Sequence, residues 1–178
     1  MDKLFSDSET YTKVRPIKIT AEQEQQFYKG LAEEIIDNKW SESDVEDIAE
    51  DISKLSLHDN GYEIAKSLEG SRNKAYYEID VEFCEFLDCI SWKKGNILEN
   101  NVKDWVKAHN PQPKFLHRQR LIVEKDLNRE KKIGTIVFVT GLAEERACYL
   151  IDENPEREGG TIIAYELVES NCKPIVLP

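Results

Sequence analysis

The 178-residue chain carries 24 Lys or Arg against 35 Asp or Glu, a formal net charge of −11 at pH 7. Hydrophobic residues make up 40% of the chain, enough for one core or two small ones, and no apolar run approaches the roughly 20 residues of a bilayer span. The N-terminus also lacks the apolar stretch of a secretory signal. We therefore expect a globular, cytoplasmic protein, unless a signal has already been removed from the chain.

An arm, residues 1–19, precedes the first predicted helix. It is either a mobile tail or an extended edge segment, and its alternating residues favour the latter, in which Pro16 would be tolerated. A helix should then run from Thr20 to about Asn38. Thr20 and Gln23 form a capping box at its start. Apolar residues follow at four-residue intervals: Phe27, Leu31 and Ile35.

The second predicted helix has one apolar stripe and one acidic side. Ser41 or Ser43 can cap it. The stripe consists of Val45, Ile48, Ile52 and Leu55. The acidic side consists of Glu42, Asp44, Glu46, Asp47, Glu50 and Asp51.

Two more helices are indicated by apolar spacing. A short one contains Tyr62, Ala65 and Leu68 and is closed by Gly70. Another opens at Asn96, with Leu98, Val102, Trp105 and Val106 facing inward.

Between them lies YYEIDVEFCEFLDC, residues 76–89, with five carboxylates, four aromatics and no basic residue. We predict a helix over residues 74–91, because its apolar positions gather within an arc of about 100°: Tyr76, Ile79, Phe83, Phe86, Leu87 and Ile90. The outward side then carries Glu78, Glu82, Glu85 and Asp88, with Tyr77 and Val81 among them. A strand is the alternative, since residues 77–83 alternate, but the alternation fails after Phe83.

The acidic positions lie close together although like charges repel. Glu78 with Glu82, Glu46 with Glu50 and Asp47 with Asp51 are pairs four residues apart, each costing roughly 0.2–0.5 kcal/mol on a helix. No Lys or Arg lies between Lys74 and Lys93 to relieve the first pair. The acids are neighbours on one face rather than a pair across a cleft, which argues against acid–base catalysis. Either this face is simply solvated, or it is a negative surface for a cationic partner.

At NPQP, residues 110–113, the spacing of the apolar residues changes from a helical to a strand-like period, and the two prolines end a helix. Residues 1–110 hold 14 Lys or Arg against 24 Asp or Glu, and residues 111–178 hold 10 against 11. We therefore expect an acidic helical domain over residues 20–110 and a small β domain over residues 111–178, an α+β fold.

Four runs rich in Val, Ile, Thr and aromatics predict a small antiparallel β-sheet in the second domain. They are Leu121–Val123, Ile133–Val139, Ala147–Ile151 and Thr161–Val168. This pattern of strands and turns resembles an SH3-like barrel module. The resemblance implies an alternative function, a regulatory adaptor whose β part binds a peptide or nucleic acid, with His117–Arg120, Arg129, Lys131 and Lys132 as a basic patch.

The sequence contains no recognisable catalytic, metal-binding or cofactor-binding motif. The cysteines Cys84, Cys89, Cys148 and Cys172 form no C-x-x-C and are not closely spaced with a histidine, so we expect reduced thiols and no metal or cofactor. The sequence holds no G-x-S-x-G, P-loop, H-E-x-x-H or G-x-G-x-x-G. We expect no enzyme, unless folding brings His109 or His117 beside an acid or Cys148.

In size, charge and lack of motifs the chain resembles the bacterial immunity proteins and antitoxins that neutralise nuclease toxins. The resemblance implies a basic protein partner and a mechanism of steric and electrostatic blockade. A field of this sign repels nucleic acid and anionic membranes. The candidate partner-binding residues are Glu42, Asp44, Asp47, Asp51, Tyr77, Glu78, Val81, Glu82, Glu85 and Asp88.

Overall fold

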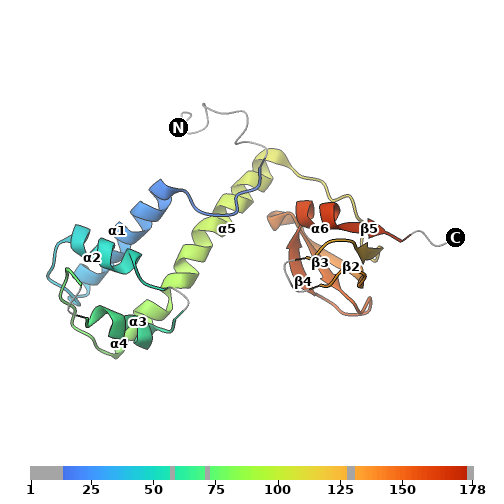
Figure 1. The fold of residues 1–178 in the computed structure, drawn as a ribbon. Coiled ribbons are helices and arrows are strands. Elements are labelled where there is room, and N and C mark those ends of the chain that lie inside the picture. The colour runs from blue at the N-terminus through green and yellow to red at the C-terminus, as the bar shows by residue number, and fades with distance from the viewer. Residues whose placement is uncertain (1–13, 57–58, 71–72, 128–130, 176–178) are drawn as a thin grey trace. The chain divides into compact units, whose positions relative to one another are not determined.

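A computed structural model describes residues 14–56, 59–70, 73–127 and 131–175 (Figure 1). It shows a helical region followed by a five-stranded antiparallel sheet, which confirms the α+β class. The chain divides into two compact units. Of the described residues, the helical unit contains those from 16 to 101, and the sheet unit contains those from 102 to 175 together with Val14 and Arg15. The last helix of the helical region therefore extends into the sheet unit, whereas the sequence indicated a boundary at residue 110.

The helical region contains α1 (Ala21–Asp37), α2 (Val45–Ser53), α3 (Gly61–Leu68), α4 (Val81–Asp88) and α5 (Ile90–His109). The capping box of α1 is confirmed: Thr20 Oγ1 accepts from the Gln23 N–H at 3.1 Å, and Gln23 Oε1 accepts from the Thr20 N–H at 3.0 Å. The cap expected for α2 is wrong, because Asp44 occupies the N-cap position and Ser41 and Ser43 bond elsewhere. Helix α3 ends before Gly70, with Glu69 as its C-cap.

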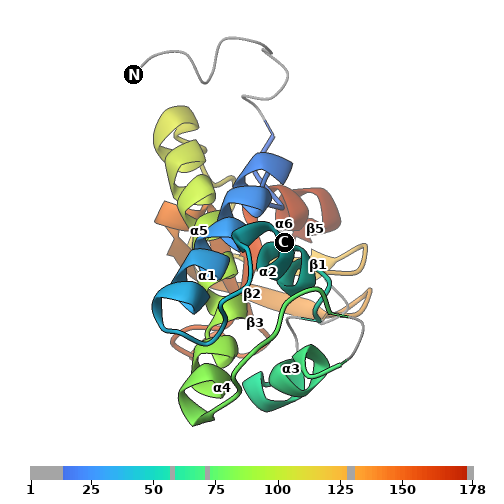
Figure 2. The ribbon, with the colours of Figure 1, turned by 90° about the vertical axis from the view of Figure 1, so that its left-hand side faces the viewer.

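The helix predicted over residues 74–91 is wrong at both ends. Residues 75–80 are not helical, and Asp80 caps α4 by accepting from the Phe83 N–H at 2.7 Å. Helix α4 is short and ends at Asp88 (Figure 2). Helix α5 begins at Ile90, one turn and a half before the predicted Asn96. The Glu78–Glu82 pair is therefore not a pair on one helix. An N-cap aspartate competes with a continuing helix because its carboxylate satisfies an N–H that would otherwise need a carbonyl one turn back.

One buried cluster forms the core of the helical unit. Its largest fully buried members come from α1, α2, α4 and α5: Ile35, Ile48, Ile52, Phe83, Leu87 and Ile90. The predicted stripes of α1 and α2 are confirmed in this cluster, although Tyr62, expected inward, is 65% exposed and Ile64 is buried in its place. No helix in the described part of the chain is long and apolar enough to cross a membrane.

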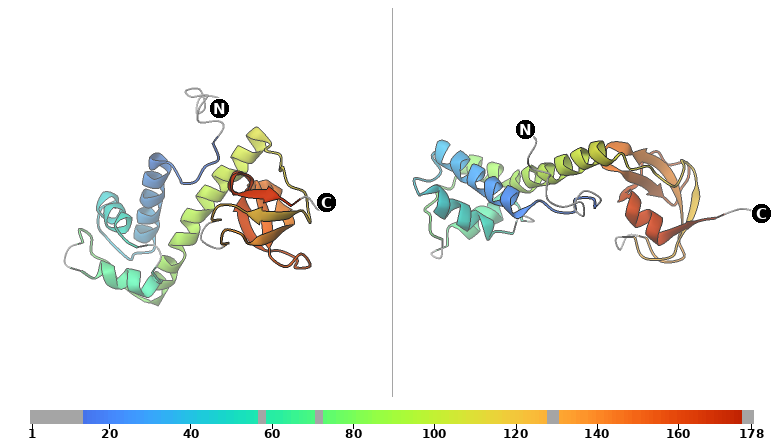
Figure 3. Two further views of the ribbon diagram at one scale, coloured as in Figure 1. Left: turned by 45° about the vertical axis from the view of Figure 1, so that its right-hand side comes forward. Right: turned by 90° about the horizontal axis from the view of Figure 1, so that it is seen from above.

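The sheet unit contains β1 (Arg120–Val123), β2 (Ile136–Ala143), the short helix η1 (Glu144–Arg146), β3 (Cys148–Asp152), β4 (Thr161–Ala164), α6 (Tyr165–Asn171) and β5 (Cys172–Pro174). The strand order is β4-β3-β2-β1-β5, and all the pairs are antiparallel. The run predicted as a strand over residues 161–168 is a strand only to Ala164. Helix α6 follows and lies against the sheet (Figure 3). Its Tyr165 and Val168 belong to the buried cluster of the unit.

Candidate functional site

The segment of residues 74–80 lies beside the loop that precedes α2. Ser41 Oγ donates to the Tyr76 carbonyl at 2.6 Å, and the Tyr76 N–H donates to Ser43 Oγ at 3.1 Å. The Glu78 N–H donates to the Trp40 carbonyl at 2.7 Å. These bonds bring together two acidic stretches that are more than 30 residues apart in the sequence.

Asp51 holds the same segment from the side of α2. It was predicted on the outward acidic side of this helix, but it is 2% exposed. Its Oδ2 accepts from the N–H groups of Lys74 and Ala75 at 2.8 and 2.9 Å and from the Tyr77 hydroxyl at 3.4 Å. Asp51 is therefore a structural carboxylate, which cannot touch a partner in this fold.

Tyr76 and Tyr77 have exchanged the positions that the predicted helix assigned to them. Tyr77 is 6% exposed and stacks on Phe83, with ring centroids 6.1 Å apart, and burial together with the Asp51 charge raises the pKa of its hydroxyl. Tyr76 is 76% exposed. Ala75 and Tyr77 are buried whereas Tyr76 is exposed, and this alternation of burial is the one that extended segments show. The alternation of residues 77–83, which supported the strand alternative, was the signal for this.

Several acids of α2 are compensated by lysines of the same unit. Lys74 Nζ lies 2.7 Å from Glu50 and 4.0 Å from Asp47, and Lys54 Nζ lies 2.9 Å from Glu50. Hydrogen bonds from these two lysines lower the pKa of Glu50 to about 2. This side of α2 therefore presents much less charge than its sequence indicated.

Another group of acids remains exposed and has no ion pair with any described Lys or Arg. We call this group, with two exposed apolar residues between its members, the acidic face: Glu42, Asp44, Glu78, Glu82, Glu85, Tyr76 and Val81. Val81 is 73% exposed, as predicted. Asp88 is exposed too, but it accepts a hydrogen bond from the Gly61 N–H and so also holds α3 against α4. Of the candidates from the sequence, five acids and Val81 are exposed in the fold and belong to this group. Tyr76, which sequence reasoning missed, is exposed with them.

The difference in net charge is larger between the two structural units than between the two domains predicted from the sequence. Residues 16–101 contain nine Lys or Arg against 20 Asp or Glu, a net charge of −11, whereas the remaining residues contain 15 of each. The whole net charge of the chain thus belongs to the unit that carries the acidic face.

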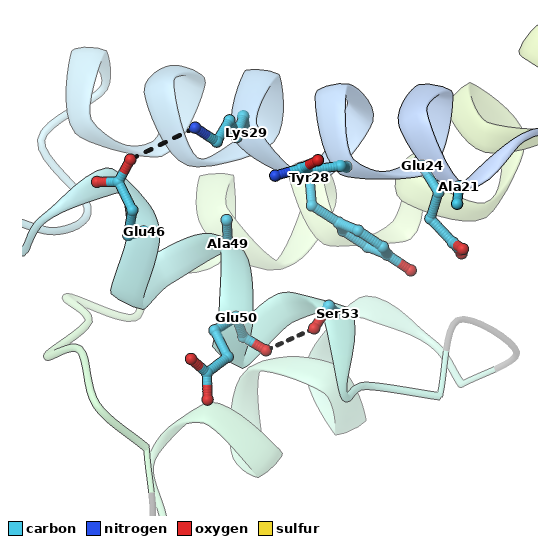
Figure 4. Close-up of a pocket in the computed structure, with 9 residues that line it drawn as sticks. Ala21, Glu24, Tyr28, Lys29, Glu46, Ala49, Glu50 and Ser53 are labelled. Atoms are coloured by element: carbon cyan, nitrogen blue, oxygen red, sulfur yellow. Dashed lines mark hydrogen bonds and ion pairs between the residues drawn. The ribbon is translucent and has the colours of Figure 1, made fainter.

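A groove of about 560 Å³ lies between α1 and α2 (Figure 4). Its three carboxylates are already paired: Glu24 with Lys94 at 2.5 Å, Glu46 with Lys29 at 3.5 Å, and Glu50 with Lys54 and Lys74 as described above. Lys94 also donates to the Tyr28 hydroxyl at 3.1 Å and lies 5.1 Å from the centre of its ring. This groove is lined by compensated charges and holds neither a histidine nor a cysteine, so the acidic face is the stronger candidate.

The described histidines bond to backbone. His109 Nδ1 lies 2.9 Å from the Trp105 carbonyl, and His117 Nε2 lies 3.0 Å from the Thr140 carbonyl. His58 lies outside the described residues. Within the described ranges, no three His, Cys, Asp or Glu side chains are grouped closely enough to hold a metal ion.

In comparisons with known proteins, no family model, no curated protein and no solved structure matches this chain.

Proposed function

We propose that the chain is an acidic binding protein that neutralises a basic protein partner, in the manner of an immunity protein or antitoxin that blocks a toxin nuclease. The observation that carries this proposal is the acidic face. It presents five carboxylates without a described cationic partner, beside exposed Tyr76 and Val81, on a unit of net charge −11.

The physical basis is electrostatic steering followed by contact. A concentrated negative field raises the rate of encounter with a cationic surface, and complementary charges suppress the wrong partners. Exposed Tyr76 adds a large contact area at a low cost in conformational entropy. A nuclease is a suitable partner because its active site must be cationic to hold phosphate. Blocking that site requires occupancy and no turnover, in keeping with the absence of catalytic motifs in the sequence.

The geometry also supports a face that is formed before binding. Tyr76 is bonded through both its N–H and its carbonyl to Ser43 and Ser41, so its backbone is held while its side chain stays exposed. A preorganised surface loses less entropy on binding than one that must fold onto its partner.

The test is capture of the partner from native cells, at low and at high salt, with three tagged proteins. The first is the wild type and the second carries Glu78→Lys, Glu82→Lys and Glu85→Lys. The third is a control that reverses three exposed acids of the same unit outside the acidic face: Glu33→Lys, Asp37→Lys and Glu63→Lys. Both variants have the same net charge, so they separate the acidic face from total charge.

We expect one stoichiometric basic protein to bind the wild type and the control and to be lost from the face variant, with weaker capture at high salt. If both variants lost the basic protein equally, its binding would depend on net charge alone and not on the acidic face. Equal retention by both would move the binding site away from the acidic face, and capture of no basic protein would contradict the proposal.

A further inference from the structure

One face of the β-sheet is apolar without belonging to the core. In β1 the buried residues are Leu121 and Val123, and in β2 they are Val137 and Val139, so the residues between them point to the opposite side of the sheet. We call that side the outer face, and it carries Ile122, Ile136, Phe138, Leu150 and Ile162. None of these five belongs to the buried cluster of the unit or to the described residues that pack around it.

The pairing of the strands joins these side chains into one surface. Ile122 lies directly opposite Ile136, and Leu150 lies directly opposite Ile162. Phe138 lies between the two pairs on β2. A single antiparallel sheet commonly packs one face on the core and leaves the other polar. Here the second face is apolar across four strands. Ile162 on the edge strand is 49% exposed, and the other four residues are half-buried. A continuous apolar surface outside the core is typical of surfaces that bind a protein.

Charges at the centre of this face indicate what covers it. Phe138 pairs with Arg120 on one side and with Asp152 on the other, so the three residues form one row across β1, β2 and β3. The Arg120 Nε is buried and has no hydrogen-bond partner among the described residues. Adjacent strands are about 4.8 Å apart, which places the backbones of Arg120 and Asp152 about 10 Å from each other, on the two sides of Phe138.

This row is complementary to itself. If two copies stack face to face about a two-fold axis that runs along β2, Phe138 meets Phe138, and each Arg120 lies over the Asp152 of the other copy. Two sheets pack face to face with nearly aligned strands in many proteins, and contacts of this symmetry are the commonest in homodimers. A carboxylate has enough acceptor sites for Arg120 in addition to Arg157, which lies 3.1 Å from Asp152.

We propose that the outer face binds a second copy of this chain and that the protein is a homodimer joined through its sheet units. The sheet unit has no net charge, so two copies meet there without the repulsion that two acidic units would experience. A nucleic acid would need an excess of Lys and Arg, which this unit lacks. The dimer does not depend on the acidic face, which lies on the other unit.

The first experiment is analytical ultracentrifugation of the full chain over a wide range of concentration. We expect the wild type to dimerise and Phe138→Glu to raise the dimer dissociation constant at least about a hundredfold, because it sets two like charges in contact at the centre. Leu116→Glu is the matched control, since Leu116 is 72% exposed in the same unit but lies outside the strands. Ile162→Glu, at the exposed edge, is the second variant if a substitution at the centre disturbs folding.

The second experiment tests the symmetry. Arg120→Glu alone and Asp152→Lys alone each place like charges together twice in a homodimer, so each should be monomeric. Mixed together, the two variants form a heterodimer in which both contacts again join opposite charges, and dimerisation should return. Thermal unfolding checks each variant, because Asp152 also accepts from the Asn154 N–H at 2.9 Å.

Three results would overturn the proposal. They are a wild type that stays monomeric at every concentration, a dimer that persists in both Phe138→Glu and Ile162→Glu, and folded charge variants whose mixture does not dimerise. The variant with three reversals on the acidic face should dimerise like the wild type, so failure of the proposed function and failure of this proposal are distinguishable.

Discussion

The carboxylate of Asp51 accepts a hydrogen bond of 2.9 Å from the backbone N–H of Ala75, and this bond fastens the segment of residues 74–80 to α2. The same oxygen accepts from the Lys74 N–H at 2.8 Å. Because Asp51 and Ala75 are both buried, water cannot readily replace the bond between them. Together with the bonds of Tyr76 to Ser41 and Ser43, this contact holds the segment with Tyr76 facing solvent.

Asp51→Ala should lower the free energy of unfolding by about 3 kcal/mol, since it leaves the buried Ala75 N–H, the Tyr77 hydroxyl and the Lys74 N–H without their acceptor. Asp51→Asn keeps one acceptor oxygen and should cost about 1–2 kcal/mol. Urea denaturation followed by circular dichroism measures both. Asp47→Ala is the control, because Asp47 is half-buried and 4.0 Å from Lys74, and it should cost under about 0.5 kcal/mol. Similar losses for the two alanine variants would contradict the structural role of Asp51.

Gly61→Ala should destabilise the helical unit by about 1–3 kcal/mol. A Cβ at Gly61 would overlap the backbone carbonyl oxygen of Cys84 and lie 2.9 Å from the Asp88 nitrogen, so α3 and α4 would have to separate. Gly30→Ala is the matched control on α1, where no atom lies within 4 Å of the new Cβ, and it should stabilise by about 0.5–1 kcal/mol. Thermal denaturation measures the change in stability of both variants. An unchanged melting temperature for Gly61→Ala would refute the close approach of α3 to α4.

Stability should fall on acidification because of Glu50. Hydrogen bonds from Lys74 and Lys54 lower its pKa from the ordinary 4.5 to about 2. A carboxyl whose pKa is lowered by folding contributes stability that is fully present above its ordinary pKa and is lost as the pH falls through the folded value. As the pH falls from about 5 to about 2, the melting temperature of Glu50→Gln should therefore fall less than that of the wild type. Parallel curves for the two proteins would contradict this prediction.

The cysteines should differ in reactivity towards iodoacetamide. Cys89 is exposed, whereas burial and nearby acids raise the pKa of Cys84, and burial raises that of Cys172 to about 11. Only the thiolate is nucleophilic. Mass spectrometry at mildly alkaline pH should therefore find Cys89 alkylated first and Cys172 last, with the difference abolished in denaturant. Equally rapid labelling of Cys172 in the native protein would refute its burial.

Local patterns were sufficient for much of the fold. The capping box at Thr20, the stripe of Val45, Ile48 and Ile52, and the β-rich runs after residue 120 predicted α1, α2 and the antiparallel sheet correctly. Each of these signals acts between residues a few positions apart, and so it is present in the sequence whatever the rest of the chain does.

The sequence by itself determined the α+β class, the start of α1 and the confinement of negative charge to the first part of the chain. Only the tertiary structure decided which acids are exposed and unpaired. Asp51 is buried because Lys74 and Ala75 bring N–H groups to it, and Glu50 is compensated because Lys74 lies across from it. These partners are more than 20 residues away, and no periodicity along one helix reveals which distant lysine or backbone amide will meet a given carboxylate.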